Sequence, residues 1–146
     1  MKRSMLVDGR GIPLSIVVAG ANINDHLLLE RTLADAVAKK PTKNPYLASL
    51  GIPSQNLCLD KGYDCERVRV LLEGTDYNDH ISCRGEEVVA RRRGSRARRW
   101  VVEACHSWLN RFRKVLVRFE KLEASYLGLL QLACAIICFR RAGVLG

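Results

Sequence analysis

The feature that most constrains the fold is an amphipathic pattern that runs from residue 96 to residue 119. On a helical wheel with about 100° per residue, this segment has an apolar side and a polar side. The apolar side consists of Val101, Cys105, Trp108, Phe112, Val115 and Phe119. The polar side consists of Arg96, Arg99, Glu103, His106, Asn110 and Lys114. We therefore predict one long helix that starts near Arg96 or Arg98 and buries its apolar side against a core.

Length and composition are those of one ordinary globular domain. The chain has 146 residues, of which 48% are hydrophobic, so it can bury a core. Twenty-four Lys and Arg residues against fifteen Asp and Glu residues leave a net charge of +9. Such an excess favours a polyanionic partner, either nucleic acid or an anionic membrane surface, and the charge alone does not choose between them.

Export and membrane insertion are not expected from the apolar segments. The first residues, MKRSMLVDGR, turn polar before the apolar stretch of a signal peptide could form. The most apolar segment, YLGLLQLACAIICF at 126–139, falls short of the roughly 20 residues that a bilayer span needs, and Gln131 interrupts it. We therefore predict a buried core helix over about 126–140 rather than a membrane anchor.

The cysteines suggest neither a disulfide framework nor a zinc ribbon. The chain has six cysteines, at positions 58, 65, 83, 105, 134 and 138. Most of them lie inside apolar runs, and no two form a CxxC pair. Cys105 stands beside His106, but no matching pair at ligand spacing accompanies them. We interpret the cysteines as reduced core residues of a cytosolic protein.

The rest of the chain alternates strand and helix signals. Two β-rich runs within residues 4–18 flank DGRG, which predicts a hairpin with Asp8 in the turn. Asn24 or Asp25 is placed to cap a helix over about 27–38, which the two prolines of KKPTKNPY end. Further along we expect a strand at 56–60, a helix within 65–74 and a strand at 80–83. The order β-β-α-β-α-β-α-α predicts an α/β fold without internal repeats.

Two carboxylates, Asp60 and Glu103, stand at positions that allow either a structural or a functional role. Asp60 ends a predicted strand and precedes Lys61-Gly62, so its own turn hydrogen bonds would account for it. Glu103 lies four residues after Arg99, and an exposed pair of this kind contributes only about 0.3 to 0.5 kcal/mol. Spacing alone favours these structural roles for both residues.

A catalytic interpretation explains the same residues together with the charge around them. Mg²⁺ or Mn²⁺ prefers carboxylate oxygens, and two ions about 3.5 to 4 Å apart can act on a phosphodiester. Six arginines crowd residues 91–99, at positions where they could hold a DNA backbone. A basic face would gather phosphates, and the carboxylate of Glu103 would hold the metal that acts on them.

Three blocks in this order resemble the C-terminal part of bacterial insertion-sequence transposases of the DDE type, in the IS-five-like group. The blocks are KRSMLVDGRGIPLSIVVAGANINDH, NLCLDKGYD and RRWVVEACHSWLNRFRKVLVRFEK, followed by an apolar helix. The resemblance implies a ribonuclease-H-like α/β fold in which two aspartates and one glutamate bind two Mg²⁺ ions. The second aspartate matches Asp60 and the glutamate matches Glu103, which are thereby expected to be catalytic metal ligands.

The basic residues follow from the same resemblance. In the family signature Y-x2-R-x3-E-x6-K, Arg99 and Glu103 keep their spacing, whereas Arg96 stands at the Tyr position and Asn110 at the Lys position. Arg99 is expected to contact phosphate near the scissile bond. The residues expected to bind DNA are Arg91, Arg92, Arg93, Arg96, Arg98, Arg99 and Asn110.

The first aspartate of the family lies on a strand upstream of the hairpin, and this chain begins at the hairpin. Asp8 aligns with the hairpin turn and Asp25 with a loop motif of the family, so neither is expected to replace it. The missing strand would be central in the sheet, and its loss leaves backbone groups on both neighbours unpaired. Residues 1–146 are therefore expected to be a partial catalytic domain, incomplete at its N-terminus, with marginal stability.

Three functional hypotheses follow. The first is a portion of a DNA transposase that cleaves element ends and joins them to target DNA, inactive without the upstream Asp-bearing segment. Its expected partners are DNA and either an upstream transposase half or further copies in a homo-oligomer. The second is a non-catalytic DNA-binding remnant or regulator of transposition, and the third is a product of a decayed element without activity. We expect the chain in the bacterial cytoplasm, associated with the nucleoid and not with a membrane.

Overall fold

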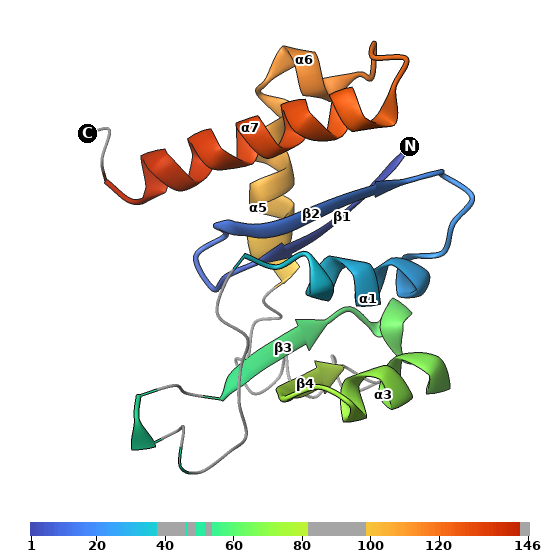
Figure 1. Cartoon of the computed structure of the whole chain (residues 1–146), viewed down its shortest axis with the longest axis vertical. Helices are drawn as coiled ribbons and strands as arrows, with labels where there is room; N and C mark the ends of the chain where they lie inside the picture. Colours follow the sequence, from blue (N-terminus) through green and yellow to red (C-terminus); the bar gives the residue numbers. More distant parts are fainter. Residues whose placement is uncertain (38–45, 47–48, 52–53, 82–98, 144–146) are drawn as a thin grey trace. The chain divides into compact units, whose positions relative to one another are not determined.

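The computed structural model describes residues 1–37, 46, 49–51, 54–81 and 99–143 and has a mixed α/β architecture (Figure 1). The chain forms two compact units. The first contains Met1–Ile23, Arg31–Val37 and Arg98–Gly146, and the second contains Asn24–Glu30 and Ala38–Ala97. The described strands form two separate two-stranded sheets, one in each unit.

The sheet of the first unit is the predicted hairpin. Strands β1 (Lys2–Val7) and β2 (Pro13–Ala19) pair antiparallel, from Lys2 opposite Ala19 to Val7 opposite Pro13. The side chain of Asp8 stabilises the turn, because its Oδ1 accepts the backbone N–H groups of Arg10 and Ile12 at 2.8 and 2.9 Å. The structure thus confirms both the hairpin and the turn position of Asp8.

The core of the first unit lies between the hairpin and three helices. These are α5 (Arg99–Asn110), α6 (Arg113–Leu116) and α7 (Glu123–Arg141). β2 is almost wholly buried because α7 packs on it, while α5 packs on β1 (Figure 1). The core cluster consists of Ile16, Val18, Leu109, Val115, Tyr126, Leu130, Ala133, Cys134 and Ile137.

The prediction of one helix through residue 119 was wrong. α5 ends at Asn110, and Phe112 takes an extended backbone with ψ of 100° before α6 begins. The apolar pattern holds within α5, where Val101 and Cys105 are buried, and Val115 is still buried although it belongs to α6. Phe119, however, is 72% exposed. Periodicity could not reveal the break, because no glycine or proline marks it.

Helix α1 (Asp25–Ala34) confirms the helix predicted after the hairpin, although it starts and ends earlier than expected. Asp25 is its first residue, and the carbonyl of Asn24 accepts the N–H of Leu27 at 3.1 Å. Thr32 ties the last turns of α1 to the hairpin. Its hydroxyl lies 2.7 Å from that of Ser4, and its carbonyl oxygen accepts the hydroxyl of Ser15 at 2.6 Å. Buried polar groups are therefore satisfied at this junction.

The second unit contains a parallel strand pair joined by a helix. Strands β3 (Gln55–Leu59) and β4 (Tyr77–Ile81) pair in register, and α3 (Glu66–Glu73) forms the crossover between them. Among its described residues the core includes Leu57, Val68 and Leu72. The strand predicted at 56–60 is confirmed. The one predicted at 80–83 begins three residues earlier, and residues 82–83 lie outside the described part.

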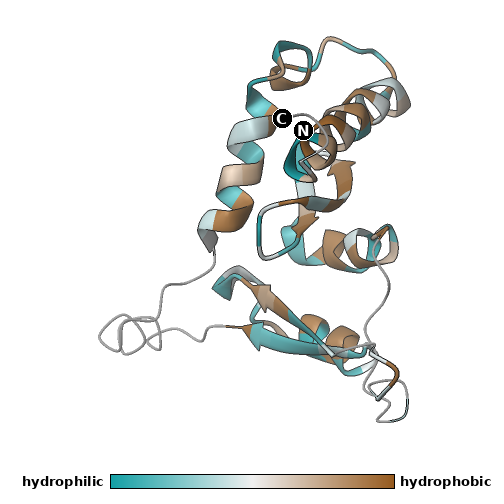
Figure 2. Ribbon diagram, turned by 90° about the vertical axis from the view of Figure 1, so that its left-hand side faces the viewer, coloured by the Kyte–Doolittle hydropathy of each residue, from teal (hydrophilic) through white to brown (hydrophobic). Residues whose placement is uncertain are grey.

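Helix α7 is the predicted C-terminal helix, and it is long and apolar enough to cross a membrane by length and composition. Figure 2 shows that hydrophobic residues dominate α7. One face, which includes Tyr126 and Leu130, packs in the core as predicted. On the other face Leu132 and Phe139 are 58% and 47% exposed, so the helix is only half enclosed by the first unit.

Candidate functional site

Asp60 follows the last residue of β3, at the carboxyl end of a parallel strand. Its backbone is extended, and its Oδ1 accepts the N–H of Lys61 at 2.9 Å, which caps the short 3-10 helix η1 (Lys61–Tyr63). The predicted turn hydrogen bond is therefore present. It uses one of about four lone-pair positions of the carboxylate, so it is compatible with metal ligation as well. Carboxyl ends of parallel strands are common places for ligand sites.

Glu103 is exposed on α5, as the helical wheel predicted. The opposite side of the helix is anchored by Val101, Cys105 and Leu109, each at most 4% exposed. Glu103 shares its face with His106 and Asn110, which follow three and seven residues later and so project from the same side. Packing of the apolar side therefore fixes which residues α5 presents to solvent.

The arginine-rich segment is mostly outside the described residues. Arg91, Arg92, Arg93, Arg96 and Arg98 lie in that part, and their expected DNA contacts stay predictions. Arg99 is the first residue of α5, and its side chain is likewise not described.

The two candidate metal ligands belong to different units, Asp60 to the second and Glu103 to the first. Both are exposed carboxylates, the donor type that Mg²⁺ prefers. Within the described ranges, no three His, Cys, Asp or Glu side chains form a group that could hold a metal ion. The residue types thus fit a divalent-metal centre, and the donor set within the described part is incomplete.

Arg3 is a candidate functional residue that sequence reasoning missed. Its Nη1 donates to Oδ1 of Asn110 at 3.1 Å, and its Nε and Nη2 donate to the hydroxyl of Tyr126 at 3.1 and 2.7 Å. Nη2 also donates to the carbonyl of Val115, which accepts the Tyr126 hydroxyl at 3.0 Å. No local signal connects Arg3 with Asn110, because 107 residues separate them.

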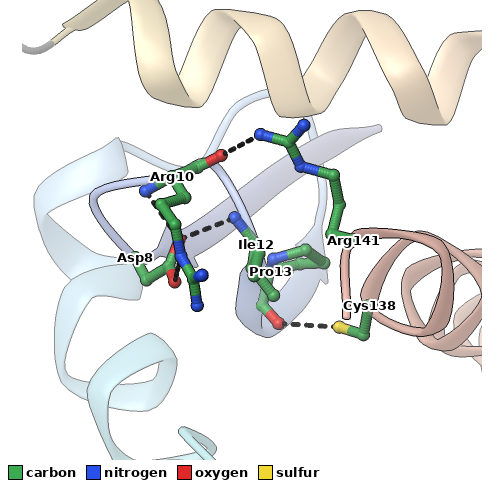
Figure 3. A network of polar contacts seen from close by, with 6 residues as sticks. All are labelled: Asp8, Arg10, Ile12, Pro13, Cys138 and Arg141. Carbon is green, nitrogen blue, oxygen red and sulfur yellow. Dashed lines mark hydrogen bonds and ion pairs between the residues drawn. The ribbon is translucent and has the colours of Figure 1, made fainter. Parts of the chain in front are cut away.

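The turn of the hairpin is held in place by α5 and α7. Arg141 donates to the carbonyl of Arg10 at 3.0 Å, and the thiol of Cys138 donates to the carbonyl of Pro13 at 3.5 Å (Figure 3). The Arg141 guanidinium also lies 4.7 Å from the ring centroid of Trp108. Arg141 therefore contacts both the hairpin turn and Trp108 of α5.

Titratable groups near the core are held in their neutral forms. Burial, and to a lesser degree the charge of Arg3, lowers the pKa of His106. Burial raises the pKa of Cys105 to about 11 and that of Cys134 to about 12, with smaller effects of neighbouring thiols. The five described cysteines are free thiols, as expected. The expectation of a core position is wrong for Cys58, which is exposed on β3.

Comparison of the sequence with known proteins identifies its family. Residues 57–140, which include both Asp60 and Glu103, match the family of the transposase DDE domain. The chain belongs to this family, the DDE-type transposases of insertion sequences.

A relative in Burkholderia cepacia is described as a candidate transposase for insertion sequence element IS402. It is 35% identical to this chain over 94% of the chain. The match covers 62% of the relative, so the chain spans less than two thirds of that protein's length. No solved structure matches the chain.

Proposed function

We propose that residues 1–146 form part of the ribonuclease-H-like catalytic domain of an insertion-sequence transposase, with Asp60 and Glu103 as two of its metal-holding carboxylates. The observation that carries the proposal is the position of Asp60 at the carboxyl end of β3, in a β-α-β unit. The family match over residues 57–140 supports it, because it spans both carboxylates.

In this proposal the carboxylates hold metal and the arginines, with Asn110, bind DNA. Asp60 and Glu103 hold Mg²⁺ or Mn²⁺, two ions in the complete site, which would supply Lewis acidity for phosphodiester cleavage and strand transfer. Arg99 contacts the phosphate near the scissile bond. Arg91, Arg92, Arg93, Arg96, Arg98 and Asn110 bind the backbone of the element ends and the target DNA. Because this activity needs chromosomal DNA, we propose that the protein acts in the bacterial cytoplasm, at the nucleoid.

In this proposal the third carboxylate comes from a strand outside the described elements. Asp8 accepts two backbone N–H groups in the hairpin turn and Asp25 begins α1, and these positions match the turn and the loop motif of the family, not its first aspartate. Among the described strands, β1 pairs with β2 and β3 pairs with β4. We propose that an Asp-bearing strand, from an upstream transposase half or from another subunit, completes both the sheet and the metal set, and that the chain is inactive without it.

The test is restoration of cleavage. The part of the Burkholderia relative that this chain does not match would be joined to the chain, and nicking of DNA that carries the element end would be measured with and without Mg²⁺. Asp60→Asn and Glu103→Gln should each reduce the rate by at least about 100-fold, since each removes a charged ligand. Asp79→Asn and Glu123→Gln, which alter carboxylates on β4 and α7, should retain activity. Cleavage by Asp60→Asn at the rate of the unmodified protein would refute the assignment.

A non-catalytic DNA-binding regulator is the second candidate, favoured by the net charge of +9. Under this function Glu103→Gln leaves DNA affinity unchanged or slightly higher, because it removes a negative charge from a phosphate-binding face. The affinity should fall steeply with salt. A dissociation constant that is independent of salt would exclude this function.

A further inference from the structure

The polar face of α5 continues from Glu103 to a cation supplied by a different element. Glu103 and Asn110 are seven residues apart, which is about 10 Å along a helix axis at 1.5 Å per residue. Asn110, at the far end of this face, accepts a hydrogen bond from Arg3 of β1. A strand thus delivers a guanidinium to the helix face that carries the proposed metal ligand.

The charge of Arg3 is not neutralised by its partners. They are the amide of Asn110, the carbonyl of Val115 and the hydroxyl of Tyr126, and in the part of the chain that the structure describes none is a carboxylate. A partly buried arginine is usually paired with an anion. Burial lowers the pKa of His106 on this face, and the charge of Arg3 adds a smaller effect in the same direction. This position therefore has the electrostatic character of an anion subsite.

The contact with Arg3 also orients the side chain of Asn110. A guanidinium only donates, so the amide oxygen has to face Arg3. The NH₂ group of Asn110 is then the end of the side chain that can donate elsewhere. Asn110 is exposed and Arg3 is partly exposed, so a ligand can reach both. Two neighbouring donor groups, one of them charged, suit a phosphate oxygen.

We propose that Arg3 and Asn110 form a phosphate subsite that binds the DNA backbone on the α5 face that carries Glu103, with Arg3 supplying its charge. The identity of the ligand as DNA rests on the proposed function. The three contacts to Asn110, Val115 and Tyr126 hold the guanidinium in place, so that little side-chain freedom is lost when a phosphate binds.

The test is a charge introduced at Asn110. In Asn110→Asp the new carboxylate lies against Arg3 and neutralises it, while the contacts of Arg3 to Val115 and Tyr126 remain. The dissociation constant for a short DNA duplex would be measured across a salt series with the unmodified chain and with the variant. Loss of one phosphate contact should reduce the slope of log K against log salt by about 0.9 and weaken binding several-fold at low salt.

Two controls separate the subsite from other effects. Gln131→Glu makes the same change in net charge on the exposed side of α7 and should keep the slope of the unmodified chain. Tyr126→Phe removes a contact that positions Arg3 but not its charge, so it should weaken binding slightly and keep the slope. An unchanged slope in Asn110→Asp, or an equal decrease in Gln131→Glu, would overturn the subsite and leave the proposed function standing. Absence of DNA binding by the unmodified chain would instead refute the proposed function.

Discussion

At the scale of single residues, buried and exposed thiols should differ in their rate of reaction with a thiol reagent. Cys105 is fully buried with a pKa of about 11, and Cys134 is 8% exposed with a pKa of about 12. Both lack the thiolate that reacts with disulfide reagents, whereas Cys58 is exposed. We expect a thiol reagent at pH 8 to modify Cys58 before Cys105 and Cys134. The reaction of Cys58 should be at least about 100-fold faster than that of Cys105, because a rise of two pKa units alone reduces the thiolate fraction about 100-fold.

Peptide mapping by mass spectrometry after timed labelling would measure this order. In denaturant Cys105 and Cys134 should react as fast as Cys58, which serves as the internal control. Equal labelling of Cys105 and Cys58 in the native protein would show that α5 does not pack its apolar side as described.

At the scale of elements, the attachment of the hairpin turn to α5 depends on Gly11. Its φ is +82°, and a Cβ at this position would lie 3.3 Å from the ring of Trp108 and from the carbonyl oxygen of Val101. Gly11→Ala combines backbone strain with this crowding, so it should lower the free energy of unfolding by about 1 to 3 kcal/mol. Urea denaturation followed by circular dichroism would measure the loss.

Gly9→Ala is the matched control in the same turn. A Cβ at Gly9 would meet nothing within 4 Å, so we expect a change within about 0.5 kcal/mol. Equal stability of the Gly11 and Gly9 variants would contradict the close approach of the turn to Trp108.

Local sequence patterns predicted most helices and strands, whereas no sequence pattern predicted the contacts between distant residues. The hairpin with Asp8, the strand ending before Asp60 and the buried side of α5 follow from turn chemistry and periodicity, which act over a few residues. The end of α5 at Asn110 could not be predicted, because the apolar pattern continues past it and no glycine or proline marks the break. The contact of Arg3 with Asn110 joins a strand to a helix end 107 residues away, and no pattern in the sequence encodes it.

At the scale of the whole molecule, the two units should differ in stability. The first has a continuous core around β2 and α7, whereas the described core of the second rests on a few side chains such as Leu57, Val68 and Leu72. Segments with less buried apolar surface open more readily. We therefore expect native-state amide exchange to be faster in β3 and α3 than in β2 and α7.

Leu72→Ala tests whether the units open separately, because it truncates a side chain that is 2% exposed in the second unit. Such a cavity costs about 2 kcal/mol or more, which would speed exchange through opening of β3 and α3 on the order of 30-fold or more. Exchange in β2 and α7 should change little, and Val70→Ala, at a position that is 59% exposed on the same helix, should change neither unit. Equal acceleration in both units would mean that they unfold as one, so that Asp60 and Glu103 share a single cooperative structure instead of being carried by units of different stability.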